Sequence, residues 1–181
     1  MKVTTGLVRL SYAHLAEPAE NPMNGKLQYS ASLIIPKDNA KSVAQVENAV
    51  KKMMEDAETL AKWGGSTKGA KSPIHDGDTE RPEDANYANC YYINVKADPQ
   101  HQPKLYDKDR MKIVSPEDIY SGCWGQAILS LYAYNFQGSK GLSFGISAFR
   151  KIKDGPSLDG VSVTDKDFDD SLLDLGADDL L

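Results

Sequence analysis

Residues 122–152 read GCWGQAILSLYAYNFQGSKGLSFGISAFRKI, and this stretch carries the clearest β pattern in the chain. Its first half alternates, which is typical of a half-buried strand. One face would carry Ala127, Leu129, Leu131 and Ala133. The other would carry Trp124, Gln126, Ile128, Ser130, Tyr132, Tyr134 and Phe136. The GSKG turn at 138–141 and the return strand at 142–152 complete a predicted β-hairpin.

Working outward, the N-terminal part predicts a second hairpin. Residues 2–12 are rich in β-branched side chains, and Pro18 to Gly25 form a turn-rich stretch. Residues 26–35 then alternate, with Lys26, Gln28, Ser30 and Ser32 on the polar side. Further strands are expected at 89–97, 104–106 and 111–114.

A single helix is expected between these hairpins. Residues 40–62 repeat apolar side chains every three or four positions, and Asp38 or Asn39 is placed to cap the first turn. Gly64 and Gly65 would end the helix. We interpret its Val/Met stripe as core packing and the Gly-, Pro- and charge-rich residues 64–88 as a long loop.

These elements together predict a mainly β fold. Five or six antiparallel strands with one inserted amphipathic helix fit a small, partly open barrel, and the oligonucleotide-binding (OB) fold is the commonest such architecture. We assign the barrel domain to residues 1–153 and a disordered acidic tail to residues 154–181.

The charge is divided between these two parts. The whole chain has a net charge of −5, but residues 154–181 hold nine aspartates and one lysine, which sum to −8 and leave +3 for residues 1–153. Alternating acidic and aliphatic residues at a chain end are typical of a docking peptide. The expected docking residues are Asp169, Asp170, Leu172, Leu173, Asp174, Asp178, Asp179, Leu180 and Leu181.

The sequence does not favour an enzyme. His14, His75 and His101 are scattered, and the HDGD stretch at 75–78 lacks the later acidic ligand of a calcium loop. We therefore expect no metal site and no cofactor. Cys90 and Cys123 are expected to be reduced thiols packed in or near the core. With no apolar segment long enough to span a membrane, we expect a soluble, cytoplasmic protein.

Aromatic and basic residues give the functional hypothesis. Proteins that bind single strands stack bases on aromatic side chains and neutralise phosphates with cations. The candidate stacking residues are Trp124, Tyr132, Tyr134, Phe136, Tyr91 and Tyr92. The candidate phosphate contacts are Lys96, Lys104, Arg110, Lys112, Lys140 and Arg150. For each aromatic residue, core packing within the barrel is the competing interpretation.

Residues 116–160 also resemble the most recognisable block of a family of phage single-stranded DNA-binding proteins. The resemblance rests on Tyr120-Ser121-Gly122-Cys123-Trp124, Tyr132-Ala133-Tyr134, Lys140-Gly141 and Asp154-Gly155. The N-terminal hairpin, the helix and the 64–78 loop match the family layout, which is similar to that of the single-stranded DNA-binding protein of T7-like phages. Here the tail ends in Leu180-Leu181 rather than an aromatic residue, which leaves the identity of its docking pocket open.

The resemblance implies a protein that protects single-stranded DNA during phage replication or recombination in the infected bacterium. Its tail would recruit phage or host enzymes and compete with DNA. Two rival hypotheses stay open: a protein–protein adaptor with a structural barrel, and a nuclease accessory protein. The sequence also leaves the oligomeric state open, a homodimer included.

Overall fold

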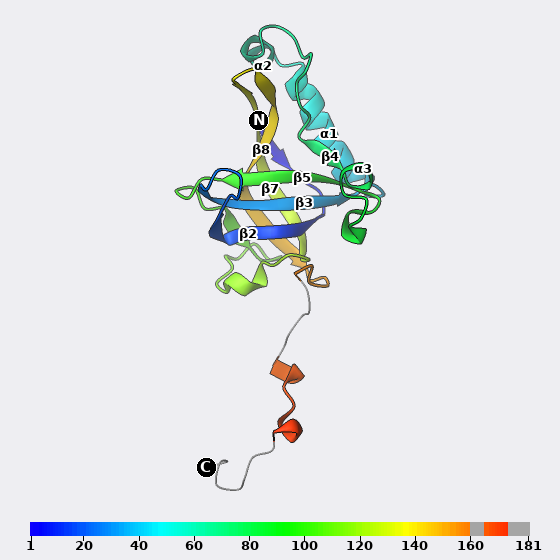
Figure 1. The fold of residues 1–181 in the computed structure, drawn as a ribbon, viewed down its shortest axis with the longest axis vertical. Helices are drawn as coiled ribbons and strands as arrows, with labels where there is room; N and C mark the ends of the chain where they lie inside the picture. Colours follow the sequence, from blue (N-terminus) through cyan, green and yellow to red (C-terminus); the bar gives the residue numbers. More distant parts are fainter. Residues whose placement is uncertain (160–164, 174–181) are drawn as a thin grey trace.

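A closed ring of five strands forms the body of the molecule, in a computed structural model that describes residues 1–159 and 165–173. The ring strands are β2 (Val8–Glu20), β3 (Leu27–Pro36), β5 (Cys90–Ala97), β7 (Trp124–Phe136) and β8 (Ser139–Lys153). They follow the order β7-β2-β3-β5-β8, and pairing of β8 with β7 closes the ring (Figure 1). This five-stranded barrel is the expected OB-like fold.

The sheet differs in detail from the prediction. β5 and β8 pair in parallel, whereas the other ring pairs are antiparallel as expected. Three short strands extend the ring: β1 (Lys2–Thr4), β4 (Ile74–Asp76) and β6 (Lys104–Tyr106). The strand expected at 111–114 is reduced to one bridge between Tyr106 and Lys112. β8 runs antiparallel to β7 and pairs through its other edge with β5, on the side of β5 away from β3. Alternation within a single strand does not reveal this pairing.

The β7–β8 hairpin confirms the alternation predicted along β7, although its turn lies at 137–138 rather than at 138–141. Ala127, Leu129 and Leu131 are fully buried on its inner face, within the main core. Phe136 pairs with Ser139, so the loop has two residues, Gln137 and Gly138, both with positive φ. This is the turn geometry that suits the twist of a hairpin.

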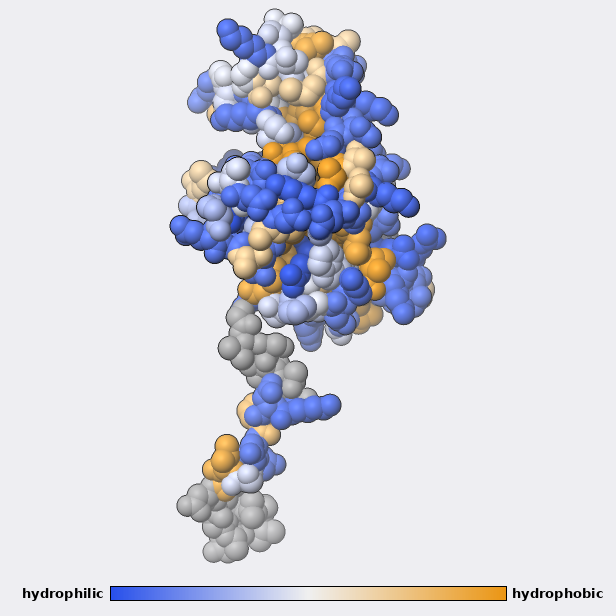
Figure 2. Space-filling view, turned by 90° about the vertical axis from the view of Figure 1, so that its right-hand side faces the viewer, coloured by the Kyte–Doolittle hydropathy of each residue, from blue (hydrophilic) through white to orange (hydrophobic). Residues whose placement is uncertain are grey.

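Two helices replace the single predicted one. α1 (Ala40–Met54) is capped by Asn39, whose side chain accepts from Ser42 N at 3.3 Å. α2 (Ala57–Lys62) begins afresh because the Asp56 carboxylate accepts from Thr59 N at 3.0 Å. The helices pack beside the β7–β8 tip, where Trp63 Nε1 donates to Tyr134 O at 3.0 Å. The space-filling view shows hydrophobic residues in a band between this upper part and the barrel (Figure 2).

The segment expected to be one long loop contains ordered elements. β4 pairs with β5 and is followed by α3 (Gly77–Glu80) and the 3-10 turn η1 (Ala85–Tyr87). Asp76 and Asp84 cap these two turns with side-chain hydrogen bonds of 3.0 Å to Asp78 N and Asn86 N. Such short capped turns have no hydrophobic period, so the sequence pattern does not distinguish them from a loop.

The segment also builds a second core on the outside of the barrel. Tyr87 is fully buried against Ile34, Cys90 and Tyr92. Cys90 and Cys123 are both free and buried, as expected. Within residues 1–159 and 165–173, no helix is long and apolar enough to cross a membrane.

The packed body continues beyond Lys153. Arg9 Nη2 donates to Pro156 O at 2.7 Å, and Leu158 N donates to Ser121 O at 2.9 Å. Leu158 also packs against the second core. C-terminal to Leu158, the described residues include the 3-10 turns η3 (Asp165–Asp167) and η4 (Asp170–Leu172). A further 3-10 turn, η2 (Pro116–Asp118), precedes β7.

Candidate nucleic-acid interface

Two adjoining hollows form one groove on the outer face of β3 and β5. The first has a volume of about 560 Å³ and is lined by residues that include Lys26, Gln28, Lys96, His101 and Tyr132. The second, of about 320 Å³, is lined by residues that include Tyr12, Gln28, Ser30, Asn94 and Lys96. Because Gln28 and Lys96 line both hollows, we treat them as one continuous groove, named here the β3–β5 groove.

Strand alternation explains why polar side chains line this groove. Tyr29, Ala31 and Leu33 point into the core from β3, so Gln28 and Ser30 face outward. Val95 is buried on β5, which turns Asn94 and Lys96 outward in the same way. Ser30 pairs directly with Lys96 across the two strands. The small side chains leave room for a ligand, while the polar ends supply hydrogen-bonding groups.

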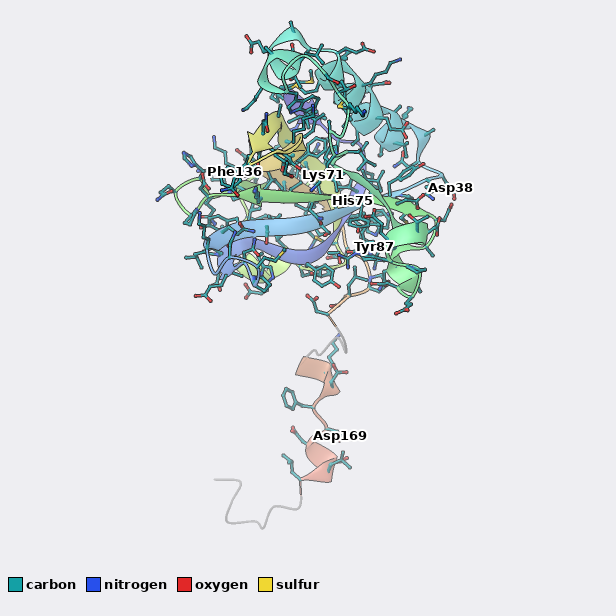
Figure 3. All side chains as sticks on the ribbon, turned by 45° about the horizontal axis from the view of Figure 1, so that its top comes forward. Asp38, Lys71, His75, Tyr87, Phe136 and Asp169 are labelled. Carbon is teal, nitrogen blue, oxygen red and sulfur yellow. The ribbon has the colours of Figure 1, made fainter. Side chains whose placement is uncertain are left out.

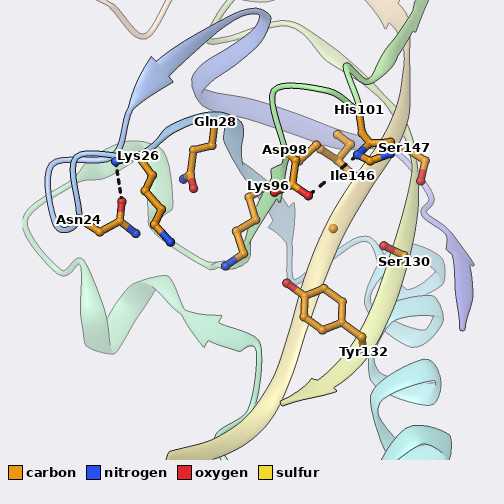
Figure 4. Close-up of a pocket in the computed structure, with 12 residues that line it drawn as sticks. Asn24, Lys26, Gln28, Lys96, Asp98, His101, Ser130, Tyr132, Ile146 and Ser147 are labelled. Atoms are coloured by element: carbon orange, nitrogen blue, oxygen red, sulfur yellow. Dashed lines mark hydrogen bonds and ion pairs between the residues drawn. The ribbon is translucent and has the colours of Figure 1, made fainter. Parts of the chain in front are cut away.

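Two lysines give the groove its positive charge. Figure 4 shows Lys26 and Lys96 reaching into the first hollow, with the Tyr132 ring across from them on β7. Neither lysine takes part in an ion pair among the residues that the structure describes. Both ammonium groups are therefore available to a polyanion. Asp98 brings a carboxylate to the rim, where its Oδ2 lies 4.0 Å from His101 Nδ1.

The predicted aromatic face of β7 is real, but its members are far apart. At about 3.3 Å per residue, Trp124 and Phe136 are separated by about 40 Å along the strand. Tyr132 is 39% exposed and lines the groove. Phe136 is 70% exposed at the hairpin tip, and Tyr134 is half-buried near it. Trp124 lies at the other end of β7, half-buried between Arg9 and Lys153, whose charges lie 5.6 and 5.3 Å from its ring.

The two tyrosines on β5 are engaged in packing. Tyr92 is only 5% exposed and stacks on His75 at 4.9 Å, with Tyr87 edge-on at 5.1 Å. Figure 3 places His75 and Tyr87 together at one end of the barrel. The expectation that Tyr92 stacks on DNA bases is therefore wrong, because β4 and the residues that follow it up to η1 cover its ring. Tyr91 is half-buried beneath the Lys37 ammonium, 4.9 Å from its ring centre.

Lys37 itself is held by two carboxylates. Its Nζ lies 2.8 Å from both Asp76 Oδ1 and Asp78 Oδ2. The hydrogen bonds to Asp76 and then Asp78 raise the pKa of Lys37 well above its usual range. In turn, the pKa of Asp78 is lowered, first by Lys37 and then by the backbone N–H of Asn89. This network fixes the covering segment to the end of β3.

The structure separates the six predicted cations, and only Lys96 among them lines the groove. Lys140 Nζ donates to Trp63 O at 3.2 Å and Ser66 O at 2.7 Å, so it ties the hairpin to the helix region. Arg150 Nε donates to Lys108 O at 3.1 Å. Lys104, Arg110 and Lys112 are exposed around β6, outside the groove.

The sequence hypothesis omitted several groove residues, among them Lys26 and Tyr12. Lys26 stands first on the polar side of the alternating stretch 26–35, so the signal was present in that pattern. Tyr12 gave no such signal, because it lies in an irregular part of β2.

The tail residues are described only in part. Phe168, Leu172 and Leu173 are 77%, 80% and 57% exposed. Asp169 accepts hydrogen bonds from the Ser171 hydroxyl and N–H, which lower the pKa of its carboxyl. The neighbouring Asp170 begins η4. The remaining predicted docking residues, Asp174, Asp178, Asp179, Leu180 and Leu181, lie outside the described residues.

The family comparison and the structure comparison agree on one group. A family model described as the single-stranded DNA-binding protein of Enterobacter phage Enc34 matches residues 1–180. No curated protein matches the sequence.

Solved structures show the same fold. One is the single-stranded DNA-binding protein from bacteriophage Enc34 in complex with single-stranded DNA, 24% identical, with 87% of this chain and 89% of that chain covered and a TM-score of 0.66. Its C-terminal truncation is 23% identical, with coverages of 87% and 88% and the same TM-score of 0.66. The T7 single-stranded DNA-binding protein gp2.5 is 14% identical, with 90% and 98% covered and a TM-score of 0.58.

At these identities the structures establish a shared fold, while the family match extends over nearly the whole sequence. The family is one of binding proteins rather than enzymes. This chain belongs to the family of the Enterobacter phage Enc34 single-stranded DNA-binding protein.

Proposed function

We propose that this protein binds single-stranded DNA in the β3–β5 groove and protects it during phage DNA replication or recombination. The observation that carries the proposal is the combination in one groove of the exposed Tyr132 ring with Lys26 and Lys96, which form no ion pair with the residues that the structure describes. The equivalent face of OB barrels, together with the loop between their first two strands, is the usual site for oligonucleotides.

The chemistry of the groove favours binding with little sequence specificity. The ammonium groups contact phosphates, which are the same at every nucleotide, and Tyr132 stacks on whichever base reaches it. Gln28, Ser30 and Asn94 add hydrogen bonds that hold the strand in place. The protein would act in the cytoplasm of the infected bacterium, where phage DNA is replicated.

The tail has a separate part in the proposal. Its −8 charge is tethered to a body of charge +3, so it occupies the groove for part of the time as a polyanion. Single-stranded DNA displaces it and releases its Asp/Leu-rich end to dock on a phage or host replication or recombination enzyme. The competition weakens as salt screens the exposed charges.

A titration of fluorescent poly-dT at several salt concentrations tests the groove. The slope of log affinity against log salt concentration is negative, and it becomes shallower by about 0.7 for each phosphate contact removed. Lys26→Ala and Lys96→Ala should each reduce the slope by about this amount. The matched control is Lys104→Ala, an exposed lysine on β6 outside the groove, which should leave the slope unchanged.

Two results would overturn the proposal. One is the absence of poly-dT binding at low salt by the unaltered protein. The other is an equal loss of affinity in the Lys96 and Lys104 variants, because it would mean that any surface lysine serves equally.

A further inference from the structure

β2 contains an irregularity that turns one aromatic side chain outward. The pairing of β2 with β3 shifts register between Ser11 and His14, which leaves Tyr12 and Ala13 in a bulge. Tyr12 has a φ of 47°, in the left-handed region that bulky residues rarely adopt. Ala13 N donates to the buried Ser121 Oγ at 3.0 Å. Bulges of this kind re-aim a side chain, and they are frequent next to functional sites.

Arg81 holds the ring that the bulge turns outward. Its guanidinium carbon lies 5.3 Å from the centre of the Tyr12 ring, and Nη1 donates to Tyr12 Oη at 3.3 Å. The same guanidinium lies 4.7 Å from the Tyr87 ring and 5.0 Å from the Tyr92 ring. Since Tyr87 and Tyr92 are buried, Arg81 connects the exposed ring to the second core.

Tyr12 remains accessible although it is held in this way. Its side chain is 55% exposed, and it lines the second hollow together with Gln28 and Lys96. Tyr132 lies in the first hollow, which shares those two residues. The groove therefore has one exposed tyrosine ring in each of its two hollows, with Lys96 common to both.

We propose that Tyr12 forms a second base-stacking subsite of the β3–β5 groove, with Arg81 as the residue that positions its ring. The ligand is an unpaired nucleobase of the strand whose phosphates contact Lys96, so the inference rests on the proposed function. Any base is accepted, because every base offers a π-face. A ring fixed before binding loses little conformational freedom when a base stacks on it.

The decisive variant is Tyr12→Asn. Asparagine tolerates the left-handed backbone, so the substitution removes the ring and spares the bulge. Affinity for poly-dT long enough to fill both hollows should fall about tenfold, within the range of one lost stacking contact. Tyr12→Phe keeps the ring and should stay within about twofold of the unaltered protein. Arg81→Lys keeps the charge but loses the planar contact, and should lie between the two.

A spectroscopic readout separates stacking from a structural role. An oligonucleotide carrying 2-aminopurine is quenched where its base stacks. We expect part of the quenching by the unaltered protein to disappear in Tyr12→Asn and to persist in Tyr12→Phe. Undiminished affinity and quenching in Tyr12→Asn would overturn the inference.

Photocrosslinking of the unaltered protein with a bromodeoxyuridine oligonucleotide decides the matter if Tyr12→Asn fails to fold. Adducts at Tyr12 support the subsite, and adducts at Tyr132 without any at Tyr12 refute it. The two proposals fail separately. If Lys26→Ala and Lys96→Ala bind normally, the groove itself is wrong; if only the Tyr12 tests are negative, the subsite alone is wrong.

Discussion

The outer face of β3 and β5 is open at one end and covered at the other. At the open end Ser30 pairs with Lys96 and both line the groove. At the covered end Ile34 pairs with Tyr92, and both are buried beneath Tyr87. The same two strands therefore place a candidate binding surface beside a second core.

The difference comes from what packs on each end. The residues from β4 to η1 lie over the covered end and are fixed by the Lys37 contacts with Asp76 and Asp78. Between the two ends, Ser32 Oγ donates to Asn94 Oδ1 at 2.6 Å. Affinity for DNA and resistance to unfolding should therefore depend on different residues of one sheet face.

The largest expected effect lies at the covered end. Tyr87→Ala removes a fully buried aromatic ring, and large-to-small substitutions of this kind cost about 3–5 kcal/mol. Ser30→Ala at the open end should change the free energy of unfolding by no more than about 0.5 kcal/mol. Urea denaturation of both variants measures the contrast. Similar losses in the two would mean that the face is not divided in this way.

Much of the fold could be predicted from local pattern, whereas the division of this face could not. Alternation along β7 and β3 identified the inward side chains, such as Leu131 and Leu33, because one face of each strand meets the core. Burial of Ile34 and Tyr92 depends instead on a distant segment folding over them. Alternation assigns both residues to the outer face and says nothing about what covers it.

The candidate site divides in a similar way. Tyr132 and Lys96 could be predicted as exposed residues on strands, and both line the groove. Trp124 and Phe136 share the β7 face with Tyr132, but they lie at the two ends of this long strand and do not line the groove. The outward position of Tyr12 depends on a β-bulge, and the amino-acid sequence gives little indication of where an extra residue interrupts the pairing of two strands.

The next prediction compares two exposed aromatics on the same face of β7. Tyr132→Ala should weaken poly-dT binding about tenfold, the cost of one lost base stack of about 1.4 kcal/mol. Phe136→Ala, at the hairpin tip, should leave affinity within about twofold. Fluorescence anisotropy at fixed salt measures both, with thermal unfolding as the folding control. A larger loss for Phe136→Ala would move the DNA path to the tip.

A smaller effect is expected from the tail. Truncation after Asp159 removes seven aspartates and one lysine, a charge of −6, and keeps the packed residues Pro156 and Leu158. Single-strand affinity should rise about threefold at low salt and be unchanged at high salt, because screening weakens the competitor.

Truncation after Asp154 is the matched comparison. It also removes the contacts of Pro156 with Arg9 and of Leu158 with Ser121, so it should lower the free energy of unfolding by about 1–2 kcal/mol as well. Equal low-salt affinity in the full-length protein and in the protein truncated after Asp159 would exclude competition by the tail.

The smallest effect concerns the residue that joins the barrel to this packed segment. Asp154 Oδ1 lies 2.6 Å from Lys151 Nζ and accepts from Tyr120 Oη at 2.8 Å. These two groups, Lys151 foremost, lower the pKa of the Asp154 carboxyl. A pKa that is lower in the folded than in the unfolded protein stabilises the fold above the ordinary aspartate value of about 4. That contribution is lost as the pH falls through the folded value.

Asp154→Asn should therefore be slightly less stable than the unaltered protein at pH 7, and this deficit should shrink as the pH falls below about 4. The side chain is 75% exposed, so solvent screening limits the difference to about 0.3 kcal/mol. Asp159→Asn is the control, since Asp159 has no ion pair among the residues that the structure describes. Urea denaturation at pH 7 and at several values below pH 4 measures the difference. If the Asp154→Asn deficit does not shrink as the pH falls, the charge of Asp154 does not hold this segment, and the hydrogen bonds of Arg9 and Ser121 must hold it instead.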